Sequence, residues 1–202
     1  MDIQPTTLTG KHLRLEPLTT GHLADLDYAC KDSPDGRRTI WRYLLDARIY
    51  REQGMAGMVK VLLERQAAGT DLPFAMIDLK SGNAVGTTRF MEIDKVNRVL
   101  EIGTWLGLGF QREGLNLESK HLMLKHAFGT LGAVRVQFKI DHRNFASLDA
   151  IERLRAYREG VMRNHIILAD GTPRSSVYYS ILDSEWPAIE LHLEALLARA
   201  GS

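Results

Sequence analysis

Two spacings of apolar residues alternate along the chain. Apolar side chains at every second position predict strands, and apolar side chains at every third or fourth position predict helices. The expected strands are His12–Pro17, Phe74–Leu79, Ala84–Ile93, Glu101–Leu106, Val134–Ile140, Gly160–Leu168 and Ser175–Leu182. The first expected helix is capped by Thr19 or Thr20 and carries Leu23, Leu26 and Cys30 on one face. The other expected helices are Tyr50–Ala68, Leu117–Thr130, Asn144–Leu154 and Ser184–Arg199.

The three strands between Phe74 and Leu106 are joined by the short turns Lys80–Asn83 and Asp94–Arg98. Strands connected this closely pair antiparallel, so they predict a meander. Helices precede and follow the meander. The order predicts an α/β (α+β) fold: a mixed, mostly antiparallel central sheet of about seven strands, flanked by helices, with an extra C-terminal helix.

The last expected helix carries Trp186, Ile189, Leu193 and Leu196 on one apolar face. An apolar face of this kind is buried in the folded protein. The spacing fits burial against the chain's own sheet and burial against a second subunit equally well, so a homodimer is one of two expected outcomes.

A strand, a polar loop and a helix follow one another between Glu101 and Thr130. The loop residues Gln111–Asn116 place Gly114 and several free backbone N–H groups at the entrance of the helix. The positive end of a helix attracts phosphate, so the loop predicts a site for a phosphate-bearing cofactor. A glycine before a helix is also typical of a simple turn, and the loop alone does not decide between these interpretations.

Length and composition fit one soluble domain covering residues 1–202, because 202 residues with 45% apolar content can bury a full core. Lys and Arg number 26 against 25 for Asp and Glu, so net charge favours neither a nucleic-acid nor a membrane partner. Cys30 is the only cysteine, which excludes an intrachain disulfide and a multi-cysteine zinc site. Met1–Gly10 lacks the pattern of a secretory signal. We expect a cytoplasmic protein without a metal.

Several short motifs together are typical of one family. They are Leu13–Leu18, Trp41-x-Tyr43-Leu44, Glu101–Trp105, Gln111-x-x-Gly114-x-Asn116, Arg135–Lys139, Asn144-x-x-Ser147 and Ile151–Leu154. With these motifs nearly the whole chain resembles the GNAT superfamily of acyl-CoA-dependent N-acetyltransferases, in particular the branch that includes the ribosomal-protein N-terminal (alanine/serine) acetyltransferases. The resemblance implies a single GNAT domain and transfer of an acetyl group from acetyl-CoA to a primary amine.

The resemblance also implies which residues hold the cofactor. In the family the loop binds the pyrophosphate of acetyl-CoA on backbone N–H groups, and the preceding strand contacts the pantetheine arm and the thioester. The cofactor-binding residues implied are Trp105, Leu106, Gln111, Arg112, Glu113, Gly114, Leu115, Asn116 and Asn144. Two residues depart from the family pattern: Asn116 replaces a small residue of the loop, and Arg155 replaces a glycine after Leu154.

Amide formation from a thioester needs a neutral amine and a stabilised thiolate. Ser147 is the expected partner of the thiolate, since the tyrosine that most of the superfamily uses is absent before Tyr157. Ser147 and Asn144 also fit a simple helix cap. Glu101 is the expected base, acting directly or through water, and Glu92 on the neighbouring strand is the alternative.

The acceptor pocket is expected to include Trp41, Tyr43 and Arg89, although aromatic residues at such positions are also common in cores. The acceptor is either a protein N-terminus or a small amine. The alternative to an enzyme is a GNAT fold that binds acyl-CoA or a partner without turnover, because a fold does not guarantee its chemistry. A nucleotide-binding module is disfavoured, since the loop lacks the G-x-x-x-x-G-K-[ST] pattern.

Overall fold

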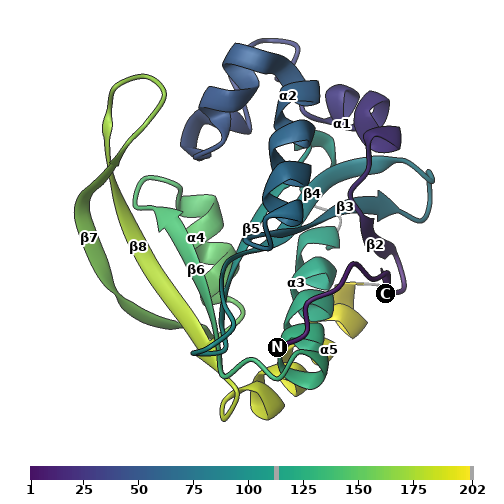
Figure 1. The fold of residues 1–202 in the computed structure, drawn as a ribbon, viewed down its shortest axis with the longest axis vertical. Coiled ribbons are helices and arrows are strands. Elements are labelled where there is room, and N and C mark those ends of the chain that lie inside the picture. Colours follow the sequence, from purple (N-terminus) through teal and green to yellow (C-terminus); the bar gives the residue numbers. More distant parts are fainter. Residues whose placement is uncertain (112–113, 201–202) are drawn as a thin grey trace.

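In the computed structural model, which describes residues 1–111 and 114–200, one mixed sheet runs through the molecule (Figure 1). The described residues form eight strands in the spatial order β1-β2-β3-β4-β5-β6-β8-β7. Their bounds are β1 Leu8–Thr9, β2 Leu13–Pro17, β3 Leu72–Asp78, β4 Ala84–Asp94, β5 Val99–Leu106, β6 Arg135–Asp141, β7 Tyr157–Ile167 and β8 Pro173–Leu182. The predicted fold class is confirmed, and the additional strand is β1, which is too short to show an alternating pattern.

The predicted meander is β3-β4-β5, whose neighbours pair antiparallel. Among the described strands only β5 and β6 pair parallel. A parallel pair needs a crossover connection, and here the chain crosses through the helix α3.

The main helices are α1 Leu23–Ala29, α2 Ala47–Ala67, α3 Leu115–Lys125, α4 Phe145–Glu152 and α5 Trp186–Ala200. The α3 helix begins two residues before the predicted Leu117, because Gly114 takes a left-handed conformation with φ 75° at its N-cap. It also ends earlier than predicted, and His126–Thr130 continue as a π-helical turn. No helix in the described part of the chain is long and apolar enough to span a membrane.

Alternate side chains of the strands build a core on each face of the sheet. Phe74 and Met76 of β3 belong to the core that includes Met123 of α3. Ala75 and Ile77 of the same strand belong to the core under α1 and α2. The sheet therefore separates α1 and α2 from α3 and α5.

The C-terminal helix packs on its own chain. Trp186, Ile189 and Leu193 are at most 7% exposed and join the same core as α3. The ring of Trp186 stacks on Phe128 at 5.5 Å, and α5 lies beside α3 (Figure 1). Of the two expected outcomes, burial within the chain is the one observed for this face.

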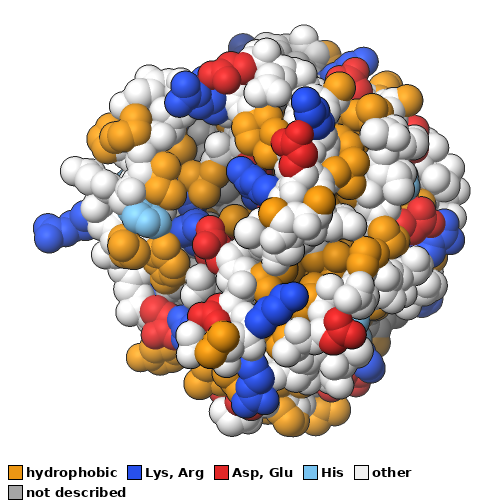
Figure 2. Space-filling model, in the orientation of Figure 1, with side chains coloured by type: hydrophobic (Ala, Val, Ile, Leu, Met, Phe, Trp, Pro, Cys, Tyr) orange, Lys and Arg blue, Asp and Glu red, His pale blue; other side chains and the backbone are white. Residues whose placement is uncertain are grey.

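One face of the surface mixes charges of both signs. Figure 2 shows Lys and Arg side chains interspersed with Asp and Glu on the face drawn. This agrees with the near-zero net charge of +1.

Candidate active site

A cavity of about 160 Å³ opens where β5 and β6 diverge. The two strands pair only at Val99–Arg135, Leu100–Val136 and Glu101–Gln137. Beyond these pairs β5 continues to Leu106 and β6 to Asp141. Because neither strand bonds the other there in the described chain, the gap exposes side chains from both faces of the sheet.

One side of the cavity, here called the α3–α4 wall, consists of Asn116 and Lys120 from α3 together with Asn144 and Ser147 from the start of α4. Asn144 is the N-cap of α4, and its side-chain oxygen accepts a hydrogen bond from the Ser147 N–H at 3.3 Å. The capping interpretation is therefore confirmed. It does not remove either residue from the cavity, because both line it.

The opposite side, here called the α2 wall, consists of Tyr43 and Asp46 before α2, Arg89 of β4, Glu101 of β5 and Lys139 of β6. It lies on the other face of the sheet from α3. A side chain on Gly103 of β5 would come near Arg89, so Arg89 shares the face of Glu101 and Gly103.

Glu101 is 3% exposed and is held by two partners. The Lys139 ammonium lies 3.1 Å from one carboxylate oxygen, and Gln137 donates a hydrogen bond of 3.1 Å to the other. The carboxylate is thus fixed in the cavity wall by an ion pair and a hydrogen bond.

Arg89 forms two ion pairs, although its Nε has no hydrogen-bond partner among the described residues. Its guanidinium lies 2.8 Å from Asp46 and 3.1 Å from Asp71. Burial raises the pKa of Asp71, against the opposing effect of Arg89 and Arg65. Arg65 of α2 also approaches both carboxylates, at 3.7 Å from Asp46 and 4.0 Å from Asp71, and these four side chains join the arm before α2 to the sheet.

Other predicted residues lie apart from the cavity. Trp41 is a core residue that stacks on Tyr50 at 3.9 Å and donates to the Cys30 carbonyl at 3.2 Å. Gln111 donates from its side chain to the Leu106 carbonyl at 3.1 Å.

The remaining predicted residues have varied placements. Trp105 lines the cavity, whereas Leu115 is buried in the core beneath the sheet. Arg112 and Glu113 lie outside the described residues. Glu92, the alternative base, is exposed at a bulge of β4 with φ 49° and does not line the cavity.

Lys120 is one of the cavity residues that were not predicted from the sequence, together with Asp141 and Arg174. Its ammonium nitrogen donates to Thr104 Oγ1 at 2.6 Å and to Asn116 Oδ1 at 3.3 Å. Burial lowers the pKa of Lys120 to about 7. A signal was present in the sequence, because Lys120 falls three residues after Leu117 and four before Leu124, on the apolar stripe of the helix.

The protein-family model described as "Acetyltransferase (GNAT) domain" matches residues 12–156 of this chain. The chain belongs to the GNAT acetyltransferase family. This confirms the predicted family.

Known GNAT proteins are similar over much of this chain. The Bacillus subtilis protein named "Putative ribosomal N-acetyltransferase YdaF" is 31% identical over 108 residues, which is 54% of this chain and only 58% of that relative. A GCN5-related N-acetyltransferase from Brucella melitensis has a TM-score of 0.84 at 29% identity, with 96% of this chain and 86% of that chain covered. Mycobacterium smegmatis RimJ in complex with CoA-disulfide shares the fold, with a TM-score of 0.80 at 17% identity over 95% of each chain.

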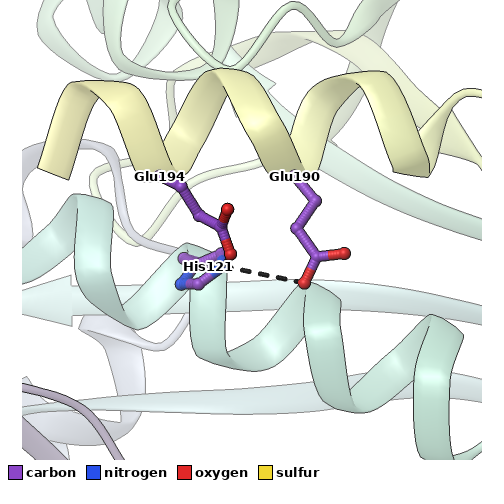
Figure 3. Close-up of side chains that lie close together, drawn as sticks. All are labelled: His121, Glu190 and Glu194. Carbon is purple, nitrogen blue, oxygen red and sulfur yellow. Dashed lines mark ion pairs between the residues drawn. The ribbon is translucent and has the colours of Figure 1, made fainter. Parts of the chain in front are cut away.

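A separate polar cluster lies on the far side of this GNAT domain's α3. Figure 3 shows His121 of α3 pointing toward Glu190 and Glu194 of α5, and the His121 Nε2 lies 4.0 Å from an oxygen of each. Their candidate ligand atoms lie within 4.8 Å of one another, a spacing that a metal ion could bridge. The same Glu190 oxygen already pairs with Lys125 at 3.1 Å, so we interpret the cluster as a contact that joins α5 to α3.

Proposed function

We propose that the chain is an N-acetyltransferase that moves an acetyl group from acetyl-CoA directly to a primary amine. The observation that supports this most strongly is the cavity between β5 and β6, which has walls on both faces of the sheet. A thioester entering along the α3–α4 wall and an amine entering along the α2 wall would meet in this gap. Holding two reactants together in this way supplies much of the rate enhancement that amide formation needs.

Features of the chain fit a phosphate-bearing thioester. The α3 helix starts at the left-handed Gly114, where its first N–H groups are available to an anion. Trp105 lines the cavity from β5, the strand that precedes this helix. The residues proposed to hold the cofactor are Trp105, Leu106, Gln111, Arg112, Glu113, Gly114, Leu115, Asn116 and Asn144.

Acetyl-CoA supplies the activated acyl group. Glu101, held by Lys139 and Gln137, accepts the proton that the amine loses, through a water. Ser147 on the opposite wall hydrogen-bonds or protonates the departing thiolate. Direct transfer is favoured over an acyl-enzyme, because Cys30 is fully buried and does not line the cavity.

The acceptor is proposed to be a primary amine on a protein N-terminus or on a small molecule. The name of the B. subtilis relative favours a ribosomal protein as the acceptor. Tyr43 and Arg89 line the side from which the amine would enter. Arg89 shapes this side through fixed ion pairs with Asp46 and Asp71.

The function is tested by incubating the protein with acetyl-CoA and a panel of N-terminal peptides and small amines, while the released thiol is measured. The proposal predicts thiol release that depends on both the protein and one class of amine. Binding of CoA without release in any mixture would instead identify an acyl-CoA-binding GNAT fold without turnover. Absence of CoA binding, measured by calorimetry, would overturn both.

A further inference from the structure

Lys120 places a buried amine in the wall of the cavity. The residue is 5% exposed, and its side chain reaches from α3 to β5. Both of its hydrogen-bond partners, Thr104 Oγ1 and Asn116 Oδ1, are uncharged. An ammonium group has three N–H donors, so one donor remains after these two bonds.

The acidic side chains that line the cavity are already paired with other cations. The pairs are Asp46 with Arg89 at 2.8 Å, Glu101 with Lys139 at 3.1 Å and Asp141 with Arg143 at 2.8 Å. Arg174, the remaining cation of the lining, donates to Ser176 and to the carbonyl oxygens of Tyr43 and Lys139. Within the described residues, Lys120 has no carboxylate within 4.0 Å, so its charge is not neutralised by the protein there.

A buried cation without a counter-ion is unfavourable, and it becomes favourable when an anion binds beside it. Lys120 lies on the α3–α4 wall with Ser147, whereas Glu101 lies on the α2 wall. In the proposed reaction the amine attacks from the side of Glu101, so negative charge on the leaving sulfur develops toward the opposite wall. The one unneutralised lysine of the cavity is therefore on the side where this charge appears.

We propose that Lys120 is a catalytic residue of the proposed acetyl transfer, whose ammonium stabilises the departing CoA thiolate and gives it a proton. This inference rests on the proposed function. Ser147 then contributes a hydrogen bond, and Lys120 contributes the charge and the proton.

The acyl carbon–sulfur bond breaks as the carbon–nitrogen bond forms, and the amine's proton passes to water beside Glu101. The sulfur takes a proton from the Lys120 ammonium, and the neutral amine regains one from solvent. A lysine with a pKa of about 7 readily protonates a thiolate, since thiols have a pKa of about 8.5.

The test is a pH titration of bound CoA followed by the ultraviolet absorbance of its thiolate, on the wild-type protein and on Lys120→Met. The two groups titrate as a coupled pair, so the apparent pKa of the bound thiol should lie about one unit or more below that of free CoA. Lys120→Met should abolish this shift. Lys125→Met is the matched control, because Lys125 is on the same helix but is 59% exposed, and it should keep the shift.

Desulfo-CoA retains every phosphate of CoA but lacks its thiol. Comparing the two ligands shows whether Lys120 pairs with the thiolate or with a phosphate. The proposal predicts that Lys120→Met weakens CoA at alkaline pH by about tenfold and leaves desulfo-CoA within about twofold. Equal weakening of both ligands, or an unchanged thiol pKa in Lys120→Met, would overturn the role of Lys120 while leaving the acetyltransferase function in place. Failure of the wild-type protein to bind CoA would overturn the proposed function itself.

Discussion

The two walls of the cavity handle charge in opposite ways. On the α2 wall, Arg89 and Glu101 are each closed into ion pairs with other side chains. On the α3–α4 wall, Lys120 contacts only uncharged groups among the described residues. The charges of Arg89 and Glu101 are therefore balanced in the free protein, whereas Lys120 gains a favourable partner when an anion binds beside it.

Removing a charge should therefore have opposite effects on stability at the two walls. Arg89→Met leaves Asp46 and the buried Asp71 with only Arg65, at 3.7 and 4.0 Å, and it should lower the free energy of unfolding by about 3 kcal/mol. The loss should shrink toward acid pH, because burial already raises the pKa of Asp71 and protonation removes the unpaired charge. Denaturant unfolding at several pH values measures this.

Arg37→Met is the control for Arg89, since Arg37 forms a 3.9 Å pair with Asp35 and its side chain is 86% exposed. It should change the free energy of unfolding by less than about 0.5 kcal/mol. An equally small effect in Arg89→Met would show that the α2 wall does not depend on its ion pairs.

Lys120→Met should instead stabilise the protein. The pKa of Lys120 is about 7 when folded against 10.5 ordinarily, so the unfolded chain binds more protons between these values and wild-type stability rises with pH across this window. The substitution should raise the free energy of unfolding by on the order of 3 kcal/mol near pH 6, and the gain should fade toward about pH 10. If Lys120→Met were less stable than the wild-type protein at both pH values, burial of the Lys120 ammonium would not be unfavourable.

Ser147→Ala tests the α3–α4 wall kinetically. Loss of one hydrogen bond to developing charge should lower kcat on the order of 100-fold, while the affinity for CoA barely changes. Steady-state thiol release, under conditions where chemistry is rate-limiting, measures this. Full turnover in the variant would show that Ser147 does not assist the departing thiolate, and Lys120 would then be its only proposed partner.

Glu101→Gln should have a smaller effect that depends on pH. It should lower kcat about tenfold at pH values where the amine is protonated, and a higher pH should partly restore the rate because solution then supplies free amine. Glu92→Gln is the control, since Glu92 is exposed outside the cavity. An unaltered pH profile in Glu101→Gln would transfer the base role to water.

Most helices and strands could be predicted from the sequence, because apolar and polar residues alternate in the strands and apolar residues form a stripe along each helix. The short β1 was missed because two residues show no period. The end of α4 was obscured by Arg155, which adopts the left-handed conformation with φ 62° that a glycine usually supplies. Such a strained residue is enforced by surrounding structure and is not visible in local propensity.

The site was only partly readable. Ser147, Asn144, Glu101 and Arg89 do meet in one cavity, because motifs located them on the elements that enclose it. Trp41 was predicted from the same kind of motif but lies in the core, stacked on Tyr50. The pairing of each charge depends on contacts across the sheet, which spacing along one element does not specify.

Calorimetric titration of CoA into the wild-type protein and into Gly114→Val tests whether the start of α3 holds the phosphates of acetyl-CoA, as proposed here. A β-branched side chain at φ 75° should block the approach of the phosphates and weaken CoA by about 100-fold. Gly132→Val is the matched control, because Gly132 has a similar φ of 65° with nothing near its side-chain position, and it should keep wild-type affinity. An unchanged CoA affinity in a folded Gly114→Val would show that the phosphates bind elsewhere.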